Sequence, residues 1–260
     1  MTHDLRNQIA LITGASRGIG KGIARTFADL GANVALVSRE ASAGETTSAE
    51  LCAITGANVV FVGGDLAYNA LQRLPHVIAS NPQKVVVLIG ANDVLAIASL
   101  KARRFYRISK RLLCGPSPEW FRTNLQAIAA QLRKTTNASV ALCSLAPIGE
   151  DLASTNAFQS EINRRIMTLN KFIREVAVEE KADYLHVYET FAAGMENTVP
   201  HPFTEFRFLP FYRDALRTLV LRKSPDEVSR LNGWEFHTDG IHLNSRGGLI
   251  IADLVEKFVL

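Results

Sequence analysis

The sequence predicts an α/β fold: a doubly wound parallel sheet with helices on both faces, in three layers. Short β-branched runs alternate along the chain with stretches whose apolar residues recur at helical spacing, and this alternation is typical of parallel sheets. The chain has 260 residues, of which 47% are hydrophobic and 21% are charged. A chain of this length and composition can bury a sizeable core. We therefore expect one α/β domain over residues 1–260.

Six runs have the composition of buried strands: Ile9–Thr13, Asn33–Ser38, Asn58–Val62, Lys84–Ile89, Ser139–Ser144 and Tyr184–Tyr188. Apolar spacing predicts helices between them, most clearly around Ile23, Phe27 and Leu30, around Phe121, Leu125 and Ile128, and over Ile250–Phe258. Ligands of such sheets bind beyond the carboxyl ends of the strands, so residues that follow a strand are the first candidates for a site. One segment, Pro200–Asn232, departs from the pattern. Its aromatic residues predict an excursion packed on the domain, with a lid or substrate pocket as the alternative.

Charge and cysteine content narrow the classes of protein. The net charge of +4 and the pI of about 9.0 favour anionic ligands, but they are too small to predict a nucleic acid partner. Three distant cysteines, Cys52, Cys114 and Cys143, share no metal-ligand spacing and predict reduced buried thiols and no metal site. The start lacks a signal-peptide pattern, and no apolar run is long enough to cross a membrane. We expect a cytoplasmic protein with no integral membrane association, and a homo-oligomer stays open.

A glycine-rich turn follows the first predicted strand, over Thr13–Gly20. Glycines let the backbone approach a phosphate, and the helix that follows points its N-terminal amides at the anion. The run resembles the TGxxxGxG cofactor loop of the short-chain dehydrogenase/reductase family, and this resemblance extends from about Gln8 to Leu66. It implies NADP rather than NAD, because a basic residue follows the second strand. The implied cofactor-binding residues are Gly14, Ser16, Arg17, Gly18, Gly20, Arg39 and Asp65. The alternative is a turn of this type that has lost its cofactor.

The catalytic residues of that reductase family are not complete in this chain. The family carries a Tyr-xxx-Lys pair on a helix, preceded by a serine after another strand. Tyr106 and Lys110 match the spacing, but only 14 residues separate Asn92 from Tyr106, with no strand between them to hold the serine. The pair also lies within Lys101–Arg111, where six of eleven residues are Lys or Arg. We interpret this stretch as a solvated basic helix face.

Two short motifs predict acid–base chemistry. In Asp239–His242 the aspartate precedes the histidine by three residues, so its carboxylate can lie beside the ring, fix the tautomer and leave the far nitrogen as a general base. In Gly90–Asp93, which follows the fourth predicted strand, Asn92 can donate an amide N–H to an oxyanion. Each motif has a plainer alternative: a helix cap at Asn92 and Asp93, and a surface turn at Asp239–His242.

Together the two motifs resemble blocks of the SGNH (GDSL-type) hydrolase family, whose third block reads GxND and whose fifth reads DxxH. The run Gly63–Ala67 is similar to the second block of that family, which would make the Gly64 amide a second oxyanion donor. This resemblance covers Gly63–Leu260, about three quarters of the chain. It implies a flavodoxin-like parallel sheet and an ester hydrolase that needs no cofactor and no metal.

The first block of the hydrolase family, a GDS motif with the nucleophilic serine, is absent, and the dehydrogenase-like segment stands in its place. The chain therefore reads as a natural or engineered fusion of residues 1–66 with residues 67–260 inside one domain. Aligning the first strands puts Ser16 in the place of the nucleophile, and Gly14–Gly18 matches the G-x-S-x-G pattern literally. Against this, a strand order of 3-2-1 separates Gly64 from Ser16 by two strand spacings, roughly 9–10 Å.

The favoured function is hydrolysis of a small acyl ester. Its catalytic residues would be Ser16 as nucleophile, His242 as base, Asp239 as its orienting partner, and Asn92 and Gly64 as oxyanion donors. Two alternatives remain. One is an NADP-binding dehydrogenase-like protein without a complete Ser-Tyr-Lys set, and the other is a catalytically inactive fusion.

Overall fold

The computed structural model describes residues 9–13, 18–31, 33–38, 50, 59–63, 66–79, 81–112, 114–196, 198–204 and 224–259. Its strands are β1 (Ile9–Thr13), β2 (Asn33–Ser38), β3 (Val59–Gly63), β4 (Lys84–Val87), β5 (Ser139–Cys143) and β6 (Asp183–Leu185). Its helices are α1 (Gly18–Asp29), α3 (Ala67–Ala79), α4 (Ala91–Ala98), α5 (Leu100–Ser109), α6 (Pro118–Thr135), α7 (Ala157–Glu179), α8 (Val187–Met195), α10 (Pro225–Asn232) and α11 (Ser245–Val259). Strands and helices alternate through most of the chain, and the predicted α/β class is confirmed.

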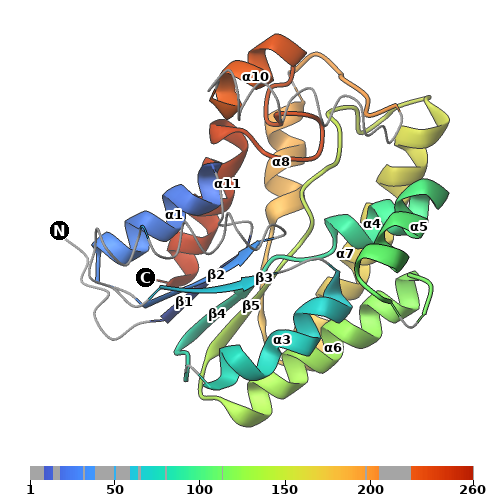
Figure 1. Ribbon diagram of the computed structural model, residues 1–260. Helices are drawn as coiled ribbons and strands as arrows, with labels where there is room; N and C mark the ends of the chain where they lie inside the picture. The colour runs from blue at the N-terminus through green and yellow to red at the C-terminus, as the bar shows by residue number, and fades with distance from the viewer. Residues whose placement is uncertain are drawn as a thin grey trace.

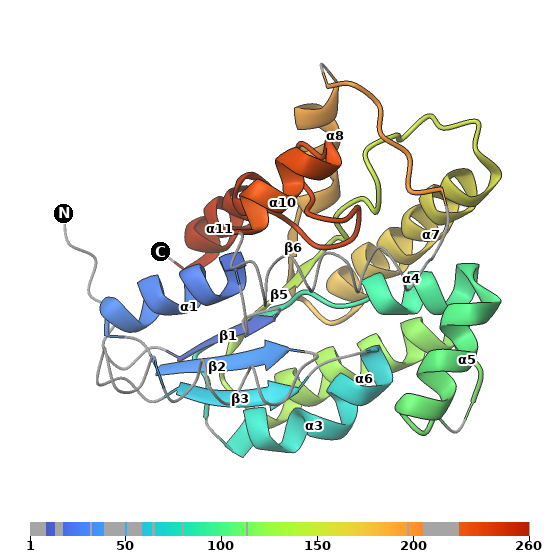
Figure 2. The same cartoon turned by 45° about the horizontal axis from the view of Figure 1, so that its top comes forward.

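All strand pairs are parallel, as predicted. Strands β1, β2 and β3 form one three-stranded sheet with β2 in the middle, and β4, β5 and β6 form a second one with β5 in the middle. The two sheets meet where β1 contacts β4, so the strands follow the order 3-2-1-4-5-6 across the molecule. Strands β1 to β5 are labelled in Figure 1 and β6 in Figure 2. The carboxyl ends of all six strands therefore lie along one edge.

Side-chain alternation along the central strands divides the core between the two faces of the sheet. Val85 and Val87 of β4 belong to one apolar cluster with α3, α4, α6 and α7, whereas Val86 belongs to a second cluster with α1, α8 and α11. Strand β5 alternates in the same way, as expected from the two-residue period of a strand. Figure 2 shows the two sets of helices on opposite sides of the strands. The sheet is thus the middle of three layers.

The strand predicted over Tyr184–Tyr188 is wrong in its second half. Strand β6 ends at Leu185, and α8 begins at Val187. Val187, Phe191 and Met195 are all buried and lie four residues apart, so burial of one helical face outweighs the strand preference of Val187 and Tyr188. The strand predicted over Lys84–Ile89 is also shorter than expected, because β4 ends at Val87.

The excursion predicted over Pro200–Asn232 is described only at its ends. Phe203 packs against the core and lies 6.0 Å from the Phe158 ring, measured between centroids. At the far end α10 begins with a capping box, in which Ser224 and Glu227 exchange hydrogen bonds. Residues 205–223, with the other aromatic residues of the predicted segment, lie outside the described part of the chain.

Among the three cysteines, Cys143 is buried and Cys114 is exposed, so the expectation of buried thiols is wrong for Cys114. Cys52 lies outside the described residues. Burial raises the pKa of the Cys143 thiol to about 12, because a thiolate is poorly solvated in an apolar core. Within the described residues no helix is long and apolar enough to cross a membrane.

Candidate active site

A glycine with an unusual backbone conformation joins β4 to α4. Gly90 has a φ of +130°, and a Cβ there would lie 2.9 Å from the side chains of both Leu145 and Phe121. Only glycine fits such a position. It is the N-cap residue of α4, so Asn92 lies in the first turn of a helix rather than directly at the strand end. The alternative of a helix cap holds for Asp93 in a different form, because its carboxylate accepts from the Ala67 amide at the start of α3.

The Asn92 amide is oriented by a buried tyrosine. The Tyr106 hydroxyl in α5 donates a hydrogen bond to Asn92 Oδ1, at 2.7 Å. A hydroxyl donor selects the carbonyl end of an amide, so Nδ2 is fixed as the end that donates. Tyr106 is buried, and this part of the predicted basic helix face is therefore wrong: Tyr106 points inward, whereas Lys101, Arg104 and Arg107 are exposed.

Asp93 links the start of α4 to the start of α3. Its Oδ2 accepts a hydrogen bond from the Ala67 amide, at 3.2 Å. Its Oδ1 has no hydrogen-bond partner in the described part of the chain. Burial raises the pKa of Asp93 to about 7, although hydrogen bonds from the backbone of Ala67 and of Asp93 itself act in the opposite direction. The bond to Ala67 shows that the chain that leaves β3 has reached α4 by residue 67.

The two ends of the DxxH motif lie in contact, as their spacing predicts. Asp239 Oδ2 lies 2.6 Å from His242 Nδ1, while Oδ1 accepts hydrogen bonds from the amides of Ile241 and His242. Burial raises the pKa of Asp239, but the charge of His242 and these hydrogen bonds lower it by more. The pKa of this carboxyl therefore lies well below its usual range. Asp239 is ionised at neutral pH and holds the imidazole in one orientation.

The turn that carries this pair is tied to the carboxyl edge of the sheet. The Gly149 amide, in the segment between β5 and α7, donates to the Gly240 carbonyl at 2.7 Å. Leu145, which follows β5, touches the position of Gly90. The segments after β4 and β5 and the Asp239–His242 turn are thus connected by direct contacts along one edge, where parallel sheets bind ligands.

A second histidine–carboxylate pair lies in the same region and was not predicted. Glu150 and His237 are both buried, and Glu150 Oε1 lies 2.8 Å from His237 Nδ1. The carboxylate also accepts hydrogen bonds from three consecutive amides, those of residues 235–237. His237 Nε2 faces the Pro147 carbonyl at 2.9 Å. Both ring nitrogens therefore face oxygen acceptors in the interior. No local motif indicates this pair, since 87 residues separate its members.

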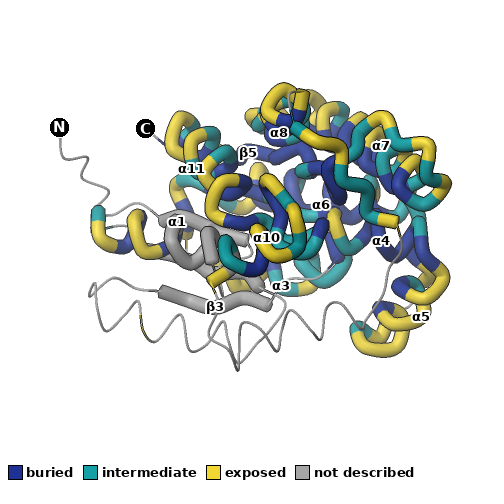
Figure 3. Tube along the Cα trace, turned by 90° about the horizontal axis from the view of Figure 1, so that it is seen from above, coloured by how far each residue is buried: buried dark blue, intermediate teal, exposed yellow. Residues whose placement is uncertain are grey.

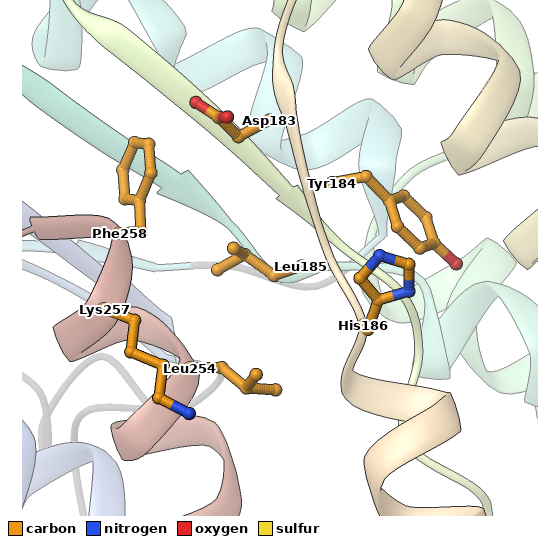
Figure 4. Close-up of a pocket in the computed structure, with 7 residues that line it drawn as sticks. All are labelled: Asp183, Tyr184, Leu185, His186, Leu254, Lys257 and Phe258. Atoms are coloured by element: carbon orange, nitrogen blue, oxygen red, sulfur yellow. The ribbon is translucent and has the colours of Figure 1, made fainter.

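A pocket of about 250 Å³ lies between β6 and α11 (Figure 4). Figure 4 shows Leu185 and Leu254 within it, with Lys257 and His186 nearby. None of the residues that line this pocket belongs to the predicted site. In the described part of the chain, no group of three or more His, Cys, Asp or Glu side chains could hold a metal ion.

Most of the predicted cofactor residues and two of the catalytic ones lie outside the described residues: Gly14, Ser16, Arg17, Arg39, Gly64 and Asp65. Gly18 and Gly20 belong to the first turn of α1. Thr13 pairs with Val37, and Val37 pairs with Val62. The strand ends that precede Ser16 and Gly64 are thus separated by two strand spacings, roughly 9–10 Å.

Comparison with known proteins gives one set of relatives for the N-terminal part of the chain and another for the complete fold. Residues 8–111 match the model of the short chain dehydrogenase family. The chain is 36% identical over 91 residues to the 3-oxoacyl-(acyl-carrier-protein) reductase FabG of Chlamydia muridarum, which covers 35% of this chain and 34% of that protein. It is 43% identical over 58 residues to retinol dehydrogenase 11 of Mus musculus, over 22% of this chain and 18% of that protein. The chain thus spans about a third or less of the length of these relatives.

The complete fold is similar to that of solved esterase structures. An acetyl xylan esterase (AlAXEase) superposes with a TM-score of 0.55 over 97% of this chain and 100% of that one, at 19% sequence identity. A protein described as a GDSL-like lipase, from Parabacteroides merdae, superposes with a TM-score of 0.52 over 98% of this chain and 96% of that one, at 15% identity. At these identities the likeness shows the fold.

Proposed function

We propose that this protein is an SGNH-type ester hydrolase that acts on a small acyl ester. The observation that carries the proposal is the ionised Asp239 carboxylate 2.6 Å from His242 Nδ1, on a turn at the carboxyl edge of the sheet. A carboxylate on Nδ1 makes Nε2 the nitrogen that takes and returns a proton. The full-length likeness to esterase folds supports this function. Hydrolysis by this route needs no cofactor.

In the proposed reaction, the Ser16 Oγ attacks the acyl carbon while His242 Nε2 takes the hydroxyl proton. The imidazolium, stabilised by Asp239, then returns this proton to the departing alcohol oxygen, which leaves an acyl-serine. A water molecule gives a proton to His242 and attacks the acyl carbon. His242 then returns this proton to Ser16 Oγ as the acyl–oxygen bond breaks, which releases the carboxylic acid and regenerates the Ser16 hydroxyl. The Nδ2 group of Asn92, oriented by Tyr106, and the Gly64 amide donate to the oxyanion.

Strand order supports Ser16 as the nucleophile. Ser16 follows β1, and β1 lies beside β4, the strand that precedes Asn92. Gly64 follows β3, which lies two strands from β1. This separation is an objection to a site that Ser16 and Gly64 share. The bond between the Ala67 amide and Asp93 weakens the objection, because three residues beyond Gly64 the chain is already at α4. We also propose that the fusion boundary lies near residue 66, inside one domain over residues 1–260.

Hydrolysis of p-nitrophenyl acetate by the purified chain tests this proposal. Ser16→Ala should abolish turnover, and Ser160→Ala, an exposed serine on α7, should not change it. Turnover that survives Ser16→Ala would show that another group attacks the ester. No turnover by the unmodified chain, with the fold intact by circular dichroism, would refute the hydrolase.

A second candidate function, NADP binding at the glycine-rich turn, is favoured by the family match over residues 8–111. Strand β1, helix α1 from Gly18 and parallel strand β2 follow one another as such a site requires. NADPH at about 100 times its dissociation constant should stabilise the fold by roughly 2.7 kcal/mol. Arg39→Ala should remove a preference for NADPH over NADH. A melting temperature that neither nucleotide shifts, together with no esterase activity, would favour the inactive fusion.

A further inference from the structure

We propose that the outer face of α5 docks this protein on an anionic phospholipid surface. This face is defined by three apolar and three cationic side chains: Leu100, Phe105, Ile108, Lys101, Arg104 and Arg107. It lies outside the proposed active site and does not depend on esterase activity. Figure 3 shows α5 at the margin of the molecule, with exposed residues along its length.

Helix α5 is fixed to the body of the protein by its opposite side. Ala102 and Tyr106, four residues apart, are buried. Ser99 accepts a hydrogen bond from the Ala102 amide and so caps the helix. The Arg103 guanidinium donates to the carbonyls of Ala96 and Ile97 at 3.1 Å. A helix held in this way has only one side left for a partner, and that side points outward.

The outward side exposes large apolar groups. Leu100, Phe105 and Ile108 have 67%, 46% and 80% of their surface exposed. On the surface of a helix, residues 100, 104 and 108 form one row at four-residue spacing. Residues 101, 105 and 108 form a second row beside it. The three apolar side chains therefore belong to one continuous face. Exposed apolar groups gathered on one face, rather than scattered singly, mark an interaction surface.

The same face is cationic and contains no acidic residue. The sequence has no Asp or Glu between Asp93 and Glu119. Elsewhere some exposed arginines are paired; Arg174, for example, contacts Glu189 at 2.7 Å. The exposed guanidinium groups of Arg104 and Arg107 make this face complementary to an anionic partner.

The mixture of the two kinds of side chain selects the class of partner. At a bilayer, aliphatic and aromatic groups enter the boundary between headgroups and acyl chains, while Lys and Arg contact lipid phosphates and carboxylates. A nucleic acid would satisfy the cations, but it offers no apolar layer for Leu100 and Ile108. The face therefore fits the cytoplasmic type of membrane surface, which is rich in anionic lipid.

Sedimentation of the full chain with sucrose-loaded vesicles tests the proposal. Vesicles of phosphatidylcholine and phosphatidylserine should bind the protein at low salt and release it at high salt, and vesicles of phosphatidylcholine alone should bind it weakly. Each cation near the surface contributes roughly fivefold to binding, so Arg104→Glu with Arg107→Glu should weaken it by about 25-fold or more. Ile108→Ser should weaken binding roughly tenfold through lost apolar insertion.

Matched controls replace equally exposed side chains on other helices. Lys134→Glu with Arg230→Glu changes the net charge as the α5 pair does, and Val178, with 76% of its surface exposed, is the counterpart of Ile108. Neither these charge changes nor Val178→Ser should alter vesicle binding. All the replaced residues are exposed, so the variants should keep the parent's melting temperature.

Three results would overturn the proposal. The first is no preference for phosphatidylserine vesicles, or a preference that the α5 variants leave unchanged. The second is binding to an oligonucleotide, but not to vesicles, that the charge variants abolish, which would assign the face to nucleic acid. The third is a lipid-independent oligomer in solution that Ile108→Ser dissociates, which would show that α5 contacts a second copy of the chain.

Discussion

Two histidine–carboxylate pairs stand within one loop region of this protein, and they differ in access. His237 is completely buried against Glu150, whereas the His242 side chain keeps 36% of its surface exposed beside Asp239. His237 also engages its second ring nitrogen with the Pro147 carbonyl. One pair is completely buried and holds the backbone of residues 235–237, and the other is partly exposed on a tight turn. We propose that only the second exchanges a proton.

The largest expected effect concerns the half-open pair. His242→Gln should lower ester hydrolysis by about 10²–10⁴-fold, because the general base is lost. Its melting temperature should stay close to that of the parent, since the ring is partly exposed. Initial rates with p-nitrophenyl acetate and a thermal melt measure both quantities. Activity within tenfold of the parent would break the proposed assignment of His242.

The buried pair should respond in the opposite way. Glu150→Ala leaves the His237 ring and three amides without their acceptor, and loss of one partner of a buried pair costs about 3–5 kcal/mol. Urea denaturation measures the change in the free energy of unfolding. Glu179→Ala is the matched control: Glu179 pairs with Arg122 at the surface, where such pairs contribute about 1 kcal/mol or less. Equal effects of the two variants would remove the distinction between the buried pair and an ordinary surface contact.

Asp93 extends the comparison to a buried carboxyl whose Oδ1 has no hydrogen-bond partner in the described structure. Its pKa is raised to about 7 from an ordinary 3.8. Between these two values the folded chain keeps a proton that the unfolded chain has lost. The contribution of Asp93 to the free energy of unfolding is therefore largest at low pH. It decreases by about 4 kcal/mol in total as the pH rises through this window. Urea denaturation of the parent and of Asp93→Asn across this pH range should show that their stability difference changes in this direction. A constant difference would contradict the raised pKa.

Two glycines, Gly240 and Gly233, allow a finer test of how the Asp239–His242 turn is built. Gly240 and Gly233 have similar φ values, +85° and +77°. A Cβ at Gly240 would approach Trp234 and Phe203 within 3.0 Å, whereas at Gly233 the nearest atom is 3.5 Å away. Gly233→Ala should cost about 1–2 kcal/mol for its backbone conformation alone, and Gly240→Ala about 1–3 kcal/mol more through overpacking. Denaturation curves of the two variants provide the test, and equal losses would show that the turn relaxes freely.

Local patterns in the sequence predict the parts of this molecule that depend on local interactions. The bounds of β1 and β2 agree with their predicted ranges, because each is a short, mostly apolar run of the kind that is typical of parallel sheets. The contact between Asp239 and His242 is also local, since a three-residue spacing closes it within one turn. The start of α8 at Val187 was not predicted, because it depends on which face the rest of the fold buries.

Distant contacts are what the sequence does not reveal. Glu150 and His237 are joined only by the packing of a late loop on the segment after β5. Tyr106 lies in a run of cations that predicts a solvated face, and only the position of α4 turns its hydroxyl toward Asn92. The assignments to Ser16, Gly64 and the cofactor turn lie outside the described residues and stay predictions.

The Glu150 carboxylate has one more consequence, for hydrogen exchange. It contacts three successive amides and one ring nitrogen. Breaking any one of these hydrogen bonds therefore disturbs the carboxylate that the other groups share. The amides of residues 235–237 should therefore exchange with deuterated solvent as a single cooperative unit, with one common opening rate. A segment of irregular backbone would then have the slow kinetics that usually belong to the interior of a helix or a sheet.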